Sequence, residues 1–348
     1  MEQHSGAALV LAADIGGTNT NCAIMDGTRA LFARRYPSGH TVNAEETLLH
    51  FLSEAAAAGC PRPSLACVCA AGPVRNGTIA MSNTAWVLTK AGLEKALGMR
   101  CFLLNDFSAV AWGILSVPPG RSQAVTALAM PDGTMPKPEA RGLIVALGAG
   151  TGLGCGFITQ DGDGPRVYPS EGGHINLPVY NEDSARLSAF LATRYESPIG
   201  AEAAVSGLGL GAILAWLASE APKPGELVCQ ILKAKANEQA RLISDAAVSD
   251  TVCALAMGMF VDLYARVASS IALAFLPYGG LYLAGGIAAK NAGWFIENNR
   301  FMRGFLASYK EHTRAILERT PVFILNNYDI SLSGAALAAS VLSQRELT

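Results

Sequence analysis

The chain has 348 residues, of which 51% are hydrophobic and 16% are charged, and its formal net charge is −2. This length is too great for one ordinary core and suits two lobes. Because the charges nearly balance, nothing draws the whole chain to nucleic acid or to an acidic membrane, and we expect neither as a partner.

The eight cysteines give no sign of a disulfide or zinc framework. Most lie in apolar runs such as 65–69, and none forms a C-x-x-C pair or a cysteine/histidine cluster with zinc spacing. We expect reduced, buried thiols in a cytoplasmic protein without a signal peptide. The longest apolar stretch, 252–278, is interrupted by Asp262 and Arg266, which favours a buried helix over a membrane span.

Two segments of the chain share one order of predicted elements, in which a strand, a glycine turn, a second strand and a hairpin turn follow one another. The matched pairs are the strands 8–14 and 142–147, the turns 16–19 and 148–152, and the hairpin turns 26–27 and 161–164. The segments align without gaps through the turn, so that Gly17 matches Gly150 and Cys22 matches Cys155. This repeat predicts two related lobes that face each other.

The rest of the chain alternates predicted strands and helices, which indicates an α/β fold. The predicted strands are 64–71, 101–104, 280–284 and 321–325, and the predicted helices are 91–97, 109–114, 184–195, 202–219, 226–246, 250–275 and 333–343. The connection 118–138 contains proline and glycine and is a candidate lobe boundary.

The first glycine turn predicts a phosphate site. It joins two strands, unlike the Walker loop, which leads into a helix and contains Gly-Lys-Ser/Thr. Glycine still lets successive backbone N–H groups surround an anion, and Thr18 and Asn19 add side-chain donors. Asp14 ends the preceding strand, where a carboxylate would hold Mg²⁺ directly or through water, or would simply cap the turn.

Asn105 and Asp106 follow the apolar run 101–104, at the carboxyl end of a predicted strand, where ligands bind in open α/β sheets. An aspartate with an ordinary pKa of about 3.9 is ionised at neutral pH. It can accept the proton that a hydroxyl loses when it attacks phosphorus. The same pair also suits the N-cap of a helix that starts near Phe107, so by itself it does not decide between catalysis and capping.

Glu171-Gly172-Gly173-His174 follows the second predicted hairpin and presents a carboxylate and an imidazole on one turn. Carboxylates accept charge-assisted hydrogen bonds from sugar hydroxyls, which discriminates against substrates that lack a hydroxyl. Metal binding is the rival interpretation, but no third ligand is spaced nearby, and His174 alone would suit a protein core.

Taken together, these motifs resemble the bacterial glucokinases of the hexokinase/actin-like ATPase superfamily, nearly from end to end. The matching segments are Asp14-Ile15-Gly16-Gly17-Thr18-Asn19, Ser82-Asn83-Thr84-Ala85-Trp86, Leu104-Asn105-Asp106-Phe107, Gly148–Gly154, Glu171–His174, Ala201-Glu202, Ser206-Gly207 and Leu283–Ile287. Their order and spacing are highly specific.

The resemblance implies an α/β, two-lobed actin-like ATPase (ribonuclease H-like) fold with a cleft between a small domain, 1–116 plus 328–348, and a large domain, 117–327. ATP with Mg²⁺ and glucose or a similar hexose would bind in the cleft, and Asp106 would be the general base in making glucose 6-phosphate. The sugar would be bound by Asn105, Glu171, His174 and Glu202. ATP would be bound by Asp14, Gly16, Gly17, Thr18, Asn19, Gly148, Gly150, Thr151, Gly152, Gly285 and Gly286. Asp14 would hold the Mg²⁺, and the protein would be a cytoplasmic homodimer.

The chain departs from the family pattern at Leu208, which stands where the family usually has proline, and in extra length near 117–140 and 219–240. It carries no cysteine between 155 and 229, unlike the related repressor/kinase family with its zinc motif. Three alternatives remain open: a kinase of mannose or an amino sugar, a polyphosphate-dependent glucokinase, and a sugar-sensing regulator. A structural protein with tight glycine turns would leave the acidic residues at strand ends unexplained.

Overall fold

The computed structural model describes residues 8–17, 19–38, 42–81, 86–117, 123–162, 164–326 and 330–345. They form two compact units. Unit 1 comes from residues 1–121 and 328–348, and unit 2 comes from residues 122–327. The last helix therefore belongs to the same unit as the first strands.

A five-stranded sheet in the order β3-β2-β1-β4-β7 forms the centre of unit 1. Its strands are β1 (Val10–Ile15), β2 (Asn19–Asp26), β3 (Arg29–Pro37), β4 (Leu65–Ala70) and β7 (Arg100–Asn105). Strands β1, β4 and β7 are parallel, so they end at the same edge of the sheet. A separate two-stranded sheet pairs β5 (Thr78–Ala80) with β6 (Val87–Thr89).

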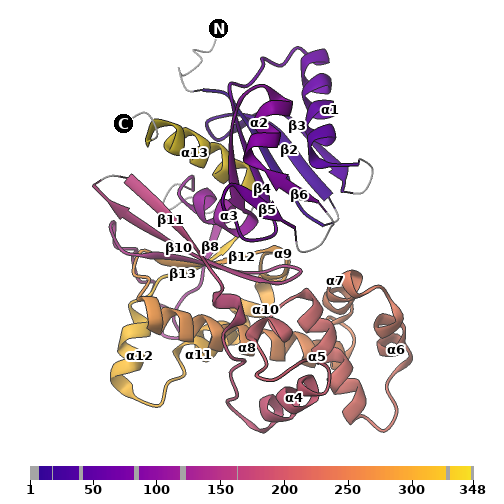
Figure 1. Ribbon diagram of the computed structural model, residues 1–348. Helices are drawn as coiled ribbons and strands as arrows, with labels where there is room; N and C mark the ends of the chain where they lie inside the picture. Colours follow the sequence, from indigo (N-terminus) through magenta and orange to yellow (C-terminus); the bar gives the residue numbers. More distant parts are fainter. Residues whose placement is uncertain are drawn as a thin grey trace. The chain divides into compact units, whose positions relative to one another are not determined.

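Helices cover both faces of this sheet (Figure 1). α1 (Ala44–Ala57) and α2 (Lys90–Leu97) pack on one face, and α3 (Asp106–Ile114) and α13 (Ile330–Arg345) on the other. Side chains alternate along a strand, and accordingly Leu11 and Ala13 join the core under α1 whereas Val10 and Ala12 join the core under α13. The sheet is therefore a buried central layer, which holds its carboxyl edge in a fixed place.

Unit 2 is built on a six-stranded sheet in the order β11-β10-β9-β12-β13-β8. Its strands are β8 (Val125–Ala127), β9 (Ile144–Ala149), β10 (Leu153–Asp161), β11 (Gly164–Ser170), β12 (Gly280–Ala284) and β13 (Val322–Leu325). β9, β12 and β13 are parallel, as are the central strands of unit 1.

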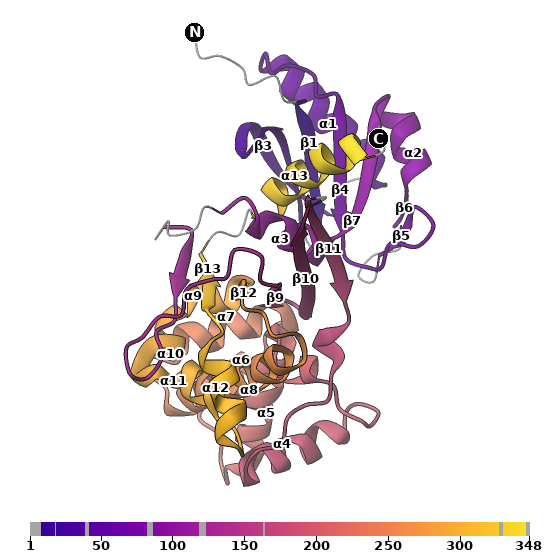
Figure 2. The same ribbon diagram turned by 90° about the vertical axis from the view of Figure 1, so that its left-hand side faces the viewer.

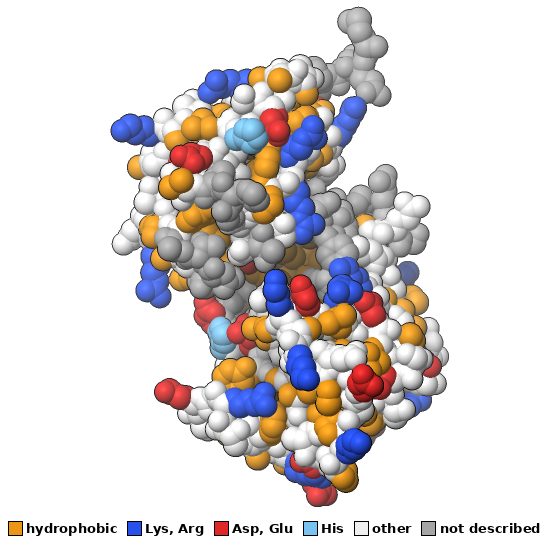
Figure 3. Space-filling model, turned by 90° about the vertical axis from the view of Figure 1, so that its right-hand side faces the viewer, with side chains coloured by type: hydrophobic (Ala, Val, Ile, Leu, Met, Phe, Trp, Pro, Cys, Tyr) orange, Lys and Arg blue, Asp and Glu red, His pale blue; other side chains and the backbone are white. Residues whose placement is uncertain are grey.

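Most helices of unit 2 gather on one side of its sheet, as Figures 1 and 2 both show. These are α4 (Glu182–Ala192), α5 (Gly207–Glu220), α6 (Glu226–Lys233), α7 (Ala236–Ala246), α8 (Thr251–Phe275), α10 (Ala292–Ile296), α11 (Arg300–Leu306) and α12 (Glu311–Glu318). Short elements complete the unit: α9 (Gly286–Lys290) and the 3₁₀ turns η1 (Gly172–His174), η2 (Ala201–Ala203) and η3 (Glu297–Asn299). On the face in Figure 3, basic and acidic side chains are interspersed among the described residues, as suits the small net charge.

The predicted internal repeat is confirmed by the strand order. β3-β2-β1-β4-β7 and β11-β10-β9-β12-β13 share one sequence of antiparallel and parallel pairings, to which unit 2 adds β8. The matched cysteines occupy equivalent places, because Cys22 pairs with Ala13 of β1 and Cys155 pairs with Leu147 of β9. Both hairpin turns form where expected, after Asp26 and after Asp161.

Helix α8 is the centre of the core of unit 2. It is long and apolar enough to pass a length-and-composition test for a membrane span, but most of its side chains are buried against the sheet and the other helices. Tyr264 is fully buried, and its hydroxyl donates a 2.7 Å hydrogen bond to the carbonyl of Leu147 in β9. The sequence-based preference for a buried helix is therefore confirmed.

Four sequence-based assignments were wrong. The helix predicted over 202–219 is divided into η2 and α5, because Ser206 is extended and caps the start of a new helix. The helix predicted over 226–246 is broken between α6 and α7, because Ala234 is extended and the Gln239 amide donates to the carbonyls of Leu232 and Ala234. These side-chain bonds satisfy carbonyls that the end of α6 leaves without helical partners. Gly148 lies within β9 and Asn19 within β2, so both glycine turns are shorter than predicted.

Candidate active site

Asp14 lies on the face of the unit 1 sheet that α3 and α13 cover. It sits next to last in β1, and alternation along the strand points its side chain away from the α1 side. Ser331, on the first turn of α13, donates a 2.7 Å hydrogen bond from Oγ to Asp14 Oδ2. The C-terminal helix thus orients a carboxylate at the edge where β1, β4 and β7 end.

In the turn after β1, the backbone at Gly16 lies close to the backbone at Asn19. The N–H of Gly16 donates to the carbonyl of Asn19 at 2.9 Å, and a Cβ at position 16 would lie 3.1 Å from the same oxygen. Gly17 is exposed beside it, and Thr18 lies outside the described residues. The predicted phosphate role of Gly16, Gly17 and Asn19 stays a prediction.

Asn105 is the N-cap of α3, as the capping alternative expected. Its Oδ1 accepts from the backbone N–H groups of Phe107 and Ser108 at 3.0 and 3.2 Å. Its Nδ2 donates to the carbonyl of Gly72, just beyond β4, at 3.2 Å. An amide nitrogen carries two hydrogens, and the Asn105 side chain also hydrogen-bonds the Asp106 carboxyl, so both hydrogens have partners within the protein. The predicted sugar contact of Asn105 stays a prediction.

Asp106 is the first residue of α3, directly after β7. Strand spacing puts the end of β7 about 10 Å from the end of β1, two strands away in the sheet. Burial raises the pKa of the Asp106 carboxyl above its usual value, although hydrogen bonds from the backbone N–H groups of Phe107 and Asp106 and from Asn105 oppose this shift. A carboxylate with a raised pKa is a stronger proton acceptor, which is the property of a general base.

In unit 2, the second glycine turn meets the start of α5. The N–H of Gly150 donates to the carbonyl of Gly152, and the N–H of Gly207 donates to the carbonyl of Gly150, both at 2.8 Å. Ser206 caps α5 by accepting from the N–H of Gly209 at 2.9 Å. Gly150 and Thr151 are exposed. A glycine turn against a helix N-terminus is a favourable place for a phosphate group.

Glu202 is fastened to this turn. Its Oε2 accepts from the N–H of Leu153 at 2.8 Å, and a Cβ at position 152 would overlap the same oxygen. A side chain at position 152 would therefore displace the carboxylate from this bond. Glu202 is one of three predicted sugar-binding residues of unit 2, and it adjoins one of the predicted phosphate turns.

Glu171 precedes the one-turn helix η1, and His174 is the last residue of η1. Their side chains are 81% and 59% exposed, and Glu171 Oε2 lies 3.7 Å from His174 Nε2. η1 is tied to η2, which carries Glu202, because the N–H of Ala201 donates to the carbonyl of Ile175 at 2.7 Å. The structure thus brings Glu171, His174 and Glu202 onto neighbouring turns of one unit.

Gly173 makes this arrangement possible. A Cβ at position 173 would overlap the carbonyl of Leu153, so η1 packs backbone to backbone on β10. We expect Gly173→Ala to shift η1, to lower the free energy of unfolding by about 1–3 kcal/mol and to weaken sugar binding at the same time. Gly162→Ala is the matched control, since a Cβ there meets no atom within 4 Å. Equal melting temperatures and equal KM values for glucose in both variants would contradict this prediction.

Gly286 lines a pocket of about 680 Å³ within unit 2, and Gly285 directly precedes it in the chain. Gly285 has a φ of 90°, and a Cβ there would overlap the carbonyl of Ala149, so this close crossing of β12 and β9 requires glycine. Gly150, Thr151, Gly207 and Gly286 all line the pocket. Both predicted nucleotide segments of unit 2 therefore open onto one cavity.

Sequence reasoning missed the wall of this pocket that α7 supplies. Asn237, Arg241 and Asp245 form one ridge of α7 at intervals of four residues, and Ala240 and Ser244 form the next, with Val248 in the turn after the helix. Arg241 and Asp245 are paired at 3.0 Å. The polar ridge was the only signal, and on its own a polar ridge more commonly marks a solvated helix face. Lys290, Asn291 and Trp294 close the other side.

The predicted site residues thus form two sets. Unit 1 holds Asp14, Gly16, Gly17, Asn19, Asn105 and Asp106 around one sheet edge. Unit 2 holds Glu171, His174, Glu202, Gly150, Thr151, Gly152, Gly285 and Gly286 around its second glycine turn and pocket, with Gly148 in the adjoining strand β9.

Comparison with known proteins bears on both sets. The chain matches the family model for glucokinase over residues 11–342. Glucokinase from Nostoc punctiforme is 33% identical over 353 residues, covering 96% of this chain and 99% of the relative.

Solved structures resemble the fold over almost the whole chain. Glucokinase from Balamuthia mandrillaris, solved in complex with glucose, has a TM-score of 0.77 at 21% identity and covers 96% of this chain and 94% of that chain. A ROK family glucokinase from Streptomyces griseus, solved in complex with glucose and AMPPNP, has a TM-score of 0.64 at 20% identity and covers 95% and 99%. The predicted α/β fold of actin-like sugar kinases is therefore confirmed, and the family match over nearly all of the described sequence shows that this chain belongs to the glucokinase family.

Proposed function

We propose that this chain transfers the terminal phosphoryl group of ATP to the 6-hydroxyl of glucose, with Asp106 as the general base. The observation that carries the proposal is the place of Asp106, which is the first residue of α3 at the carboxyl edge of the unit 1 sheet and has a raised pKa. The chain's membership of the glucokinase family supports both the reaction and the substrate.

Asp106 accepts the proton of the 6-hydroxyl as that oxygen attacks phosphorus. The transition state of phosphoryl transfer needs positioning and charge stabilisation more than covalent chemistry. Asn105 caps α3 and donates to the carbonyl of Gly72, so it fixes the start of the helix on which Asp106 stands. The proton therefore moves to the Asp106 carboxylate, which is held in position because Asn105 links the start of α3 to the backbone at Gly72.

The hydroxyls of the sugar ring are bound by Glu171, His174 and Glu202, and by the side-chain amide of Asn105, which would exchange its bond to Gly72 or to Asp106 for one to the sugar. Two carboxylates accept from hydroxyls, and the imidazole and the amide can donate to them. Buried or charged acceptors left without a partner disfavour sugars that lack a hydroxyl. Because Glu202 also holds the turn at Gly152, sugar binding and phosphate binding in unit 2 share one side chain.

The phosphates of ATP are bound by the two glycine turns, with the N-terminus of α5 behind Gly150. The adenosine occupies the pocket that Gly286 and α7 line. Asp14 suits Mg²⁺, because Mg²⁺ prefers oxygen ligands and commonly takes one carboxylate together with phosphate oxygens and waters. Bound there, Mg²⁺ would neutralise charge on the phosphates, and Ser331 would keep the carboxylate oriented.

A coupled assay of ADP release tests the proposal. With MgATP and a panel of glucose, mannose, glucosamine and 2-deoxyglucose, we expect kcat/KM to be highest for glucose. ATP hydrolysis in the absence of sugar should be slower than glucose phosphorylation by orders of magnitude, because a sugar kinase excludes water as a competing phosphoryl acceptor. A higher kcat/KM for mannose or glucosamine would show that the preferred substrate is that sugar and not glucose. Turnover with polyphosphate and not with ATP would show that polyphosphate is the phosphoryl donor.

We also propose that the protein acts in the cytoplasm as a homodimer. All eight cysteines are free thiols, most of them buried, which suits a reducing compartment. The dimer rests on the family resemblance, and light scattering coupled to gel filtration measures it. A mass near 36.2 kDa would show a monomer instead.

A further inference from the structure

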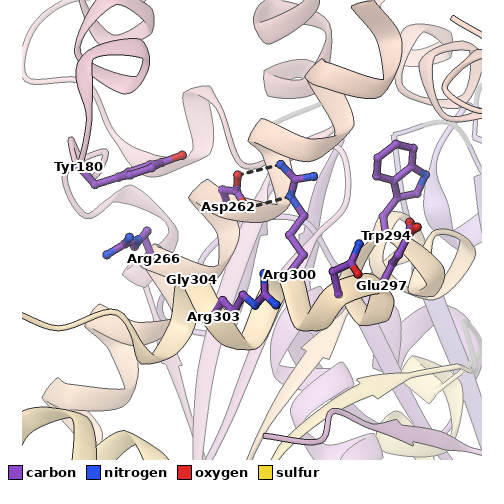
Figure 4. Close-up of a pocket in the computed structure, with 9 residues that line it drawn as sticks. Tyr180, Asp262, Arg266, Trp294, Glu297, Arg300, Arg303 and Gly304 are labelled. Atoms are coloured by element: carbon purple, nitrogen blue, oxygen red, sulfur yellow. Dashed lines mark hydrogen bonds and ion pairs between the residues drawn. The ribbon is translucent and has the colours of Figure 1, made fainter. Parts of the chain in front are cut away.

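A second pocket in unit 2 contains side chains that the proposed reaction does not use. It has a volume of about 410 Å³ and lies between α8, α10, η3 and α11, with Tyr180 at one side (Figure 4). Its lining residues are Tyr180, Asp262, Arg266, Trp294, Glu297, Asn298, Arg300, Arg303 and Gly304. We call it the arginine pocket. Its volume falls within the range of small-molecule sites.

Arginines dominate the charge of this pocket, with three guanidinium groups against the carboxylates of Asp262 and Glu297. Arg300 is neutralised, because it donates to both oxygens of Asp262 at 2.9 and 3.0 Å. Arg266 lies 4.8 Å from the ring centre of Tyr180 and donates to the carbonyl of Ala307 at 3.3 Å, which holds its guanidinium in place.

Arg303 has no hydrogen-bond or ion-pair partner among the described residues, and its side chain is exposed at the pocket. It stands one turn along α11 from Arg300, and in Figure 4 it lies between Arg266 and Glu297. Arginine forks match the geometry of phosphate oxygens. Arg266 and Arg303 are therefore the groups available for a phosphoryl anion, and the Asp262–Arg300 pair lies beside them.

The opposite side of the pocket has a different chemistry. Trp294 offers an aromatic face, and Glu297 lies on the same side of the pocket in Figure 4. Asn298, in the left-handed conformation with a φ of 51°, follows Glu297 in the chain. A carboxylate and an amide bind hydroxyls, and a flat aromatic ring packs on an apolar face. Cationic, hydroxyl-binding and aromatic groups thus occur together, as a phosphorylated sugar would require.

Trp294 lines both the arginine pocket and the pocket assigned to adenosine. The two pockets therefore share one wall, formed by the short helix α10. We propose that the arginine pocket is an effector site for a small sugar phosphate, and that Trp294 makes binding there and binding of the nucleotide interdependent. The proposal that a sugar phosphate binds in the arginine pocket needs no assumption about the reaction. The proposal that Trp294 couples this binding to the nucleotide rests on the proposed nucleotide site.

Isothermal titration calorimetry with glucose 6-phosphate tests the site. Saturating glucose and AMPPNP are present, so that the sugar and nucleotide sites are filled before the titration. We expect one molecule of glucose 6-phosphate to bind per chain. Arg303→Ala should weaken this binding about 10- to 100-fold, the usual loss for a hydrogen bond to a charged group. Arg141→Ala is the matched control, because Arg141 is an exposed arginine that lines neither pocket.

The probe panel distinguishes the sources of the ligand. If glucose 1-phosphate binds more tightly than glucose 6-phosphate, the site is supported, but its effector is not the product of the proposed reaction. Inorganic phosphate binding as tightly as either sugar phosphate would overturn the sugar half of the proposal. No binding of any probe, or equal binding by wild type and Arg303→Ala, would overturn the site, whether or not the chain phosphorylates glucose.

Omitting AMPPNP tests the coupling. We expect the Kd for glucose 6-phosphate to change at least about five-fold between samples with and without the nucleotide, and the Kd for AMPPNP to change by the same factor in the reciprocal titration. Equal Kd values would overturn the role of Trp294. Circular dichroism and the unaltered kcat of Arg303→Ala would show that the variant is folded.

Discussion

Asp106→Asn is expected to lower kcat for glucose phosphorylation by about 100- to 10,000-fold, the usual contribution of a positioned general base. The amide keeps the size of the carboxylate but cannot accept the proton of the attacking hydroxyl. KM for ATP should change little, because the nucleotide segments do not involve this residue. Steady-state kinetics with the same coupled assay measure both constants.

Asp132→Asn is the control for this substitution. Asp132 is an aspartate in an exposed turn, where its Oδ1 accepts from the N–H of Thr134 at 2.9 Å, and an amide oxygen can make the same bond. This variant should keep wild-type kcat. Undiminished kcat in Asp106→Asn would remove the role of base from Asp106.

The raised pKa of Asp106 also predicts the effect of the substitution on stability. A group whose pKa is raised by folding contributes stability at low pH, and this contribution is lost as the pH rises through the folded-state pKa. At pH 7 the raised pKa of Asp106 therefore costs stability, because burial disfavours the charged form of the carboxyl. Asp106→Asn should melt at or above the wild-type temperature at pH 7, and this advantage should disappear in acid. A lower melting temperature at pH 7 would contradict the pKa direction.

Asp14→Asn is expected to have the second largest effect, a fall of about 100-fold or more in kcat/KM for MgATP. Losing a direct or water-mediated ligand to Mg²⁺ removes charge stabilisation of several kcal/mol, and about 1.4 kcal/mol corresponds to each factor of ten. A titration of Mg²⁺ at fixed ATP should show that the variant needs more metal. An unchanged Mg²⁺ requirement would argue that Asp14 only caps the turn.

Ser331→Ala gives the graded companion to this prediction. It removes the hydrogen bond to Asp14 Oδ2 but keeps the carboxylate, so the loss should be smaller than in Asp14→Asn. Ser340→Ala is the matched control on the same helix, because among the described residues the Ser340 hydroxyl donates within α13, to the carbonyl of Ala336. Ser331→Ala and Ser340→Ala with the same kcat/KM would show that the contact does not orient Asp14.

Strands and turns that are marked by glycine and turn residues close to them in the sequence were predicted correctly. The run 280–284 is bounded by glycine at both ends and becomes β12 without any change of bounds. The repeated strand–turn–strand order predicted the shared sheet topology, because each segment carries its own turn residues. The break between α6 and α7 was missed, since no proline or glycine marks it and side-chain bonds from Gln239 to carbonyls stabilise it.

Residues that meet only in the folded chain were beyond sequence reasoning. Ser331 reaches Asp14 across 317 residues of sequence, so nothing near either residue predicts the contact. The α7 wall of the pocket proposed for adenosine is another example, because its polar ridge has the pattern of an ordinary solvated helix face. The role of Asn105 as N-cap was foreseen as an alternative, and the structure confirms the cap.

The most direct test of the central claim is the identity of the product. Wild-type protein with MgATP and glucose, followed by phosphorus NMR, should give glucose 6-phosphate and ADP in equal amounts. 6-Deoxyglucose should give no sugar phosphate, because it lacks the attacking hydroxyl. Phosphate on any other position of glucose, or release of inorganic phosphate with no sugar phosphate, would contradict transfer to the 6-hydroxyl.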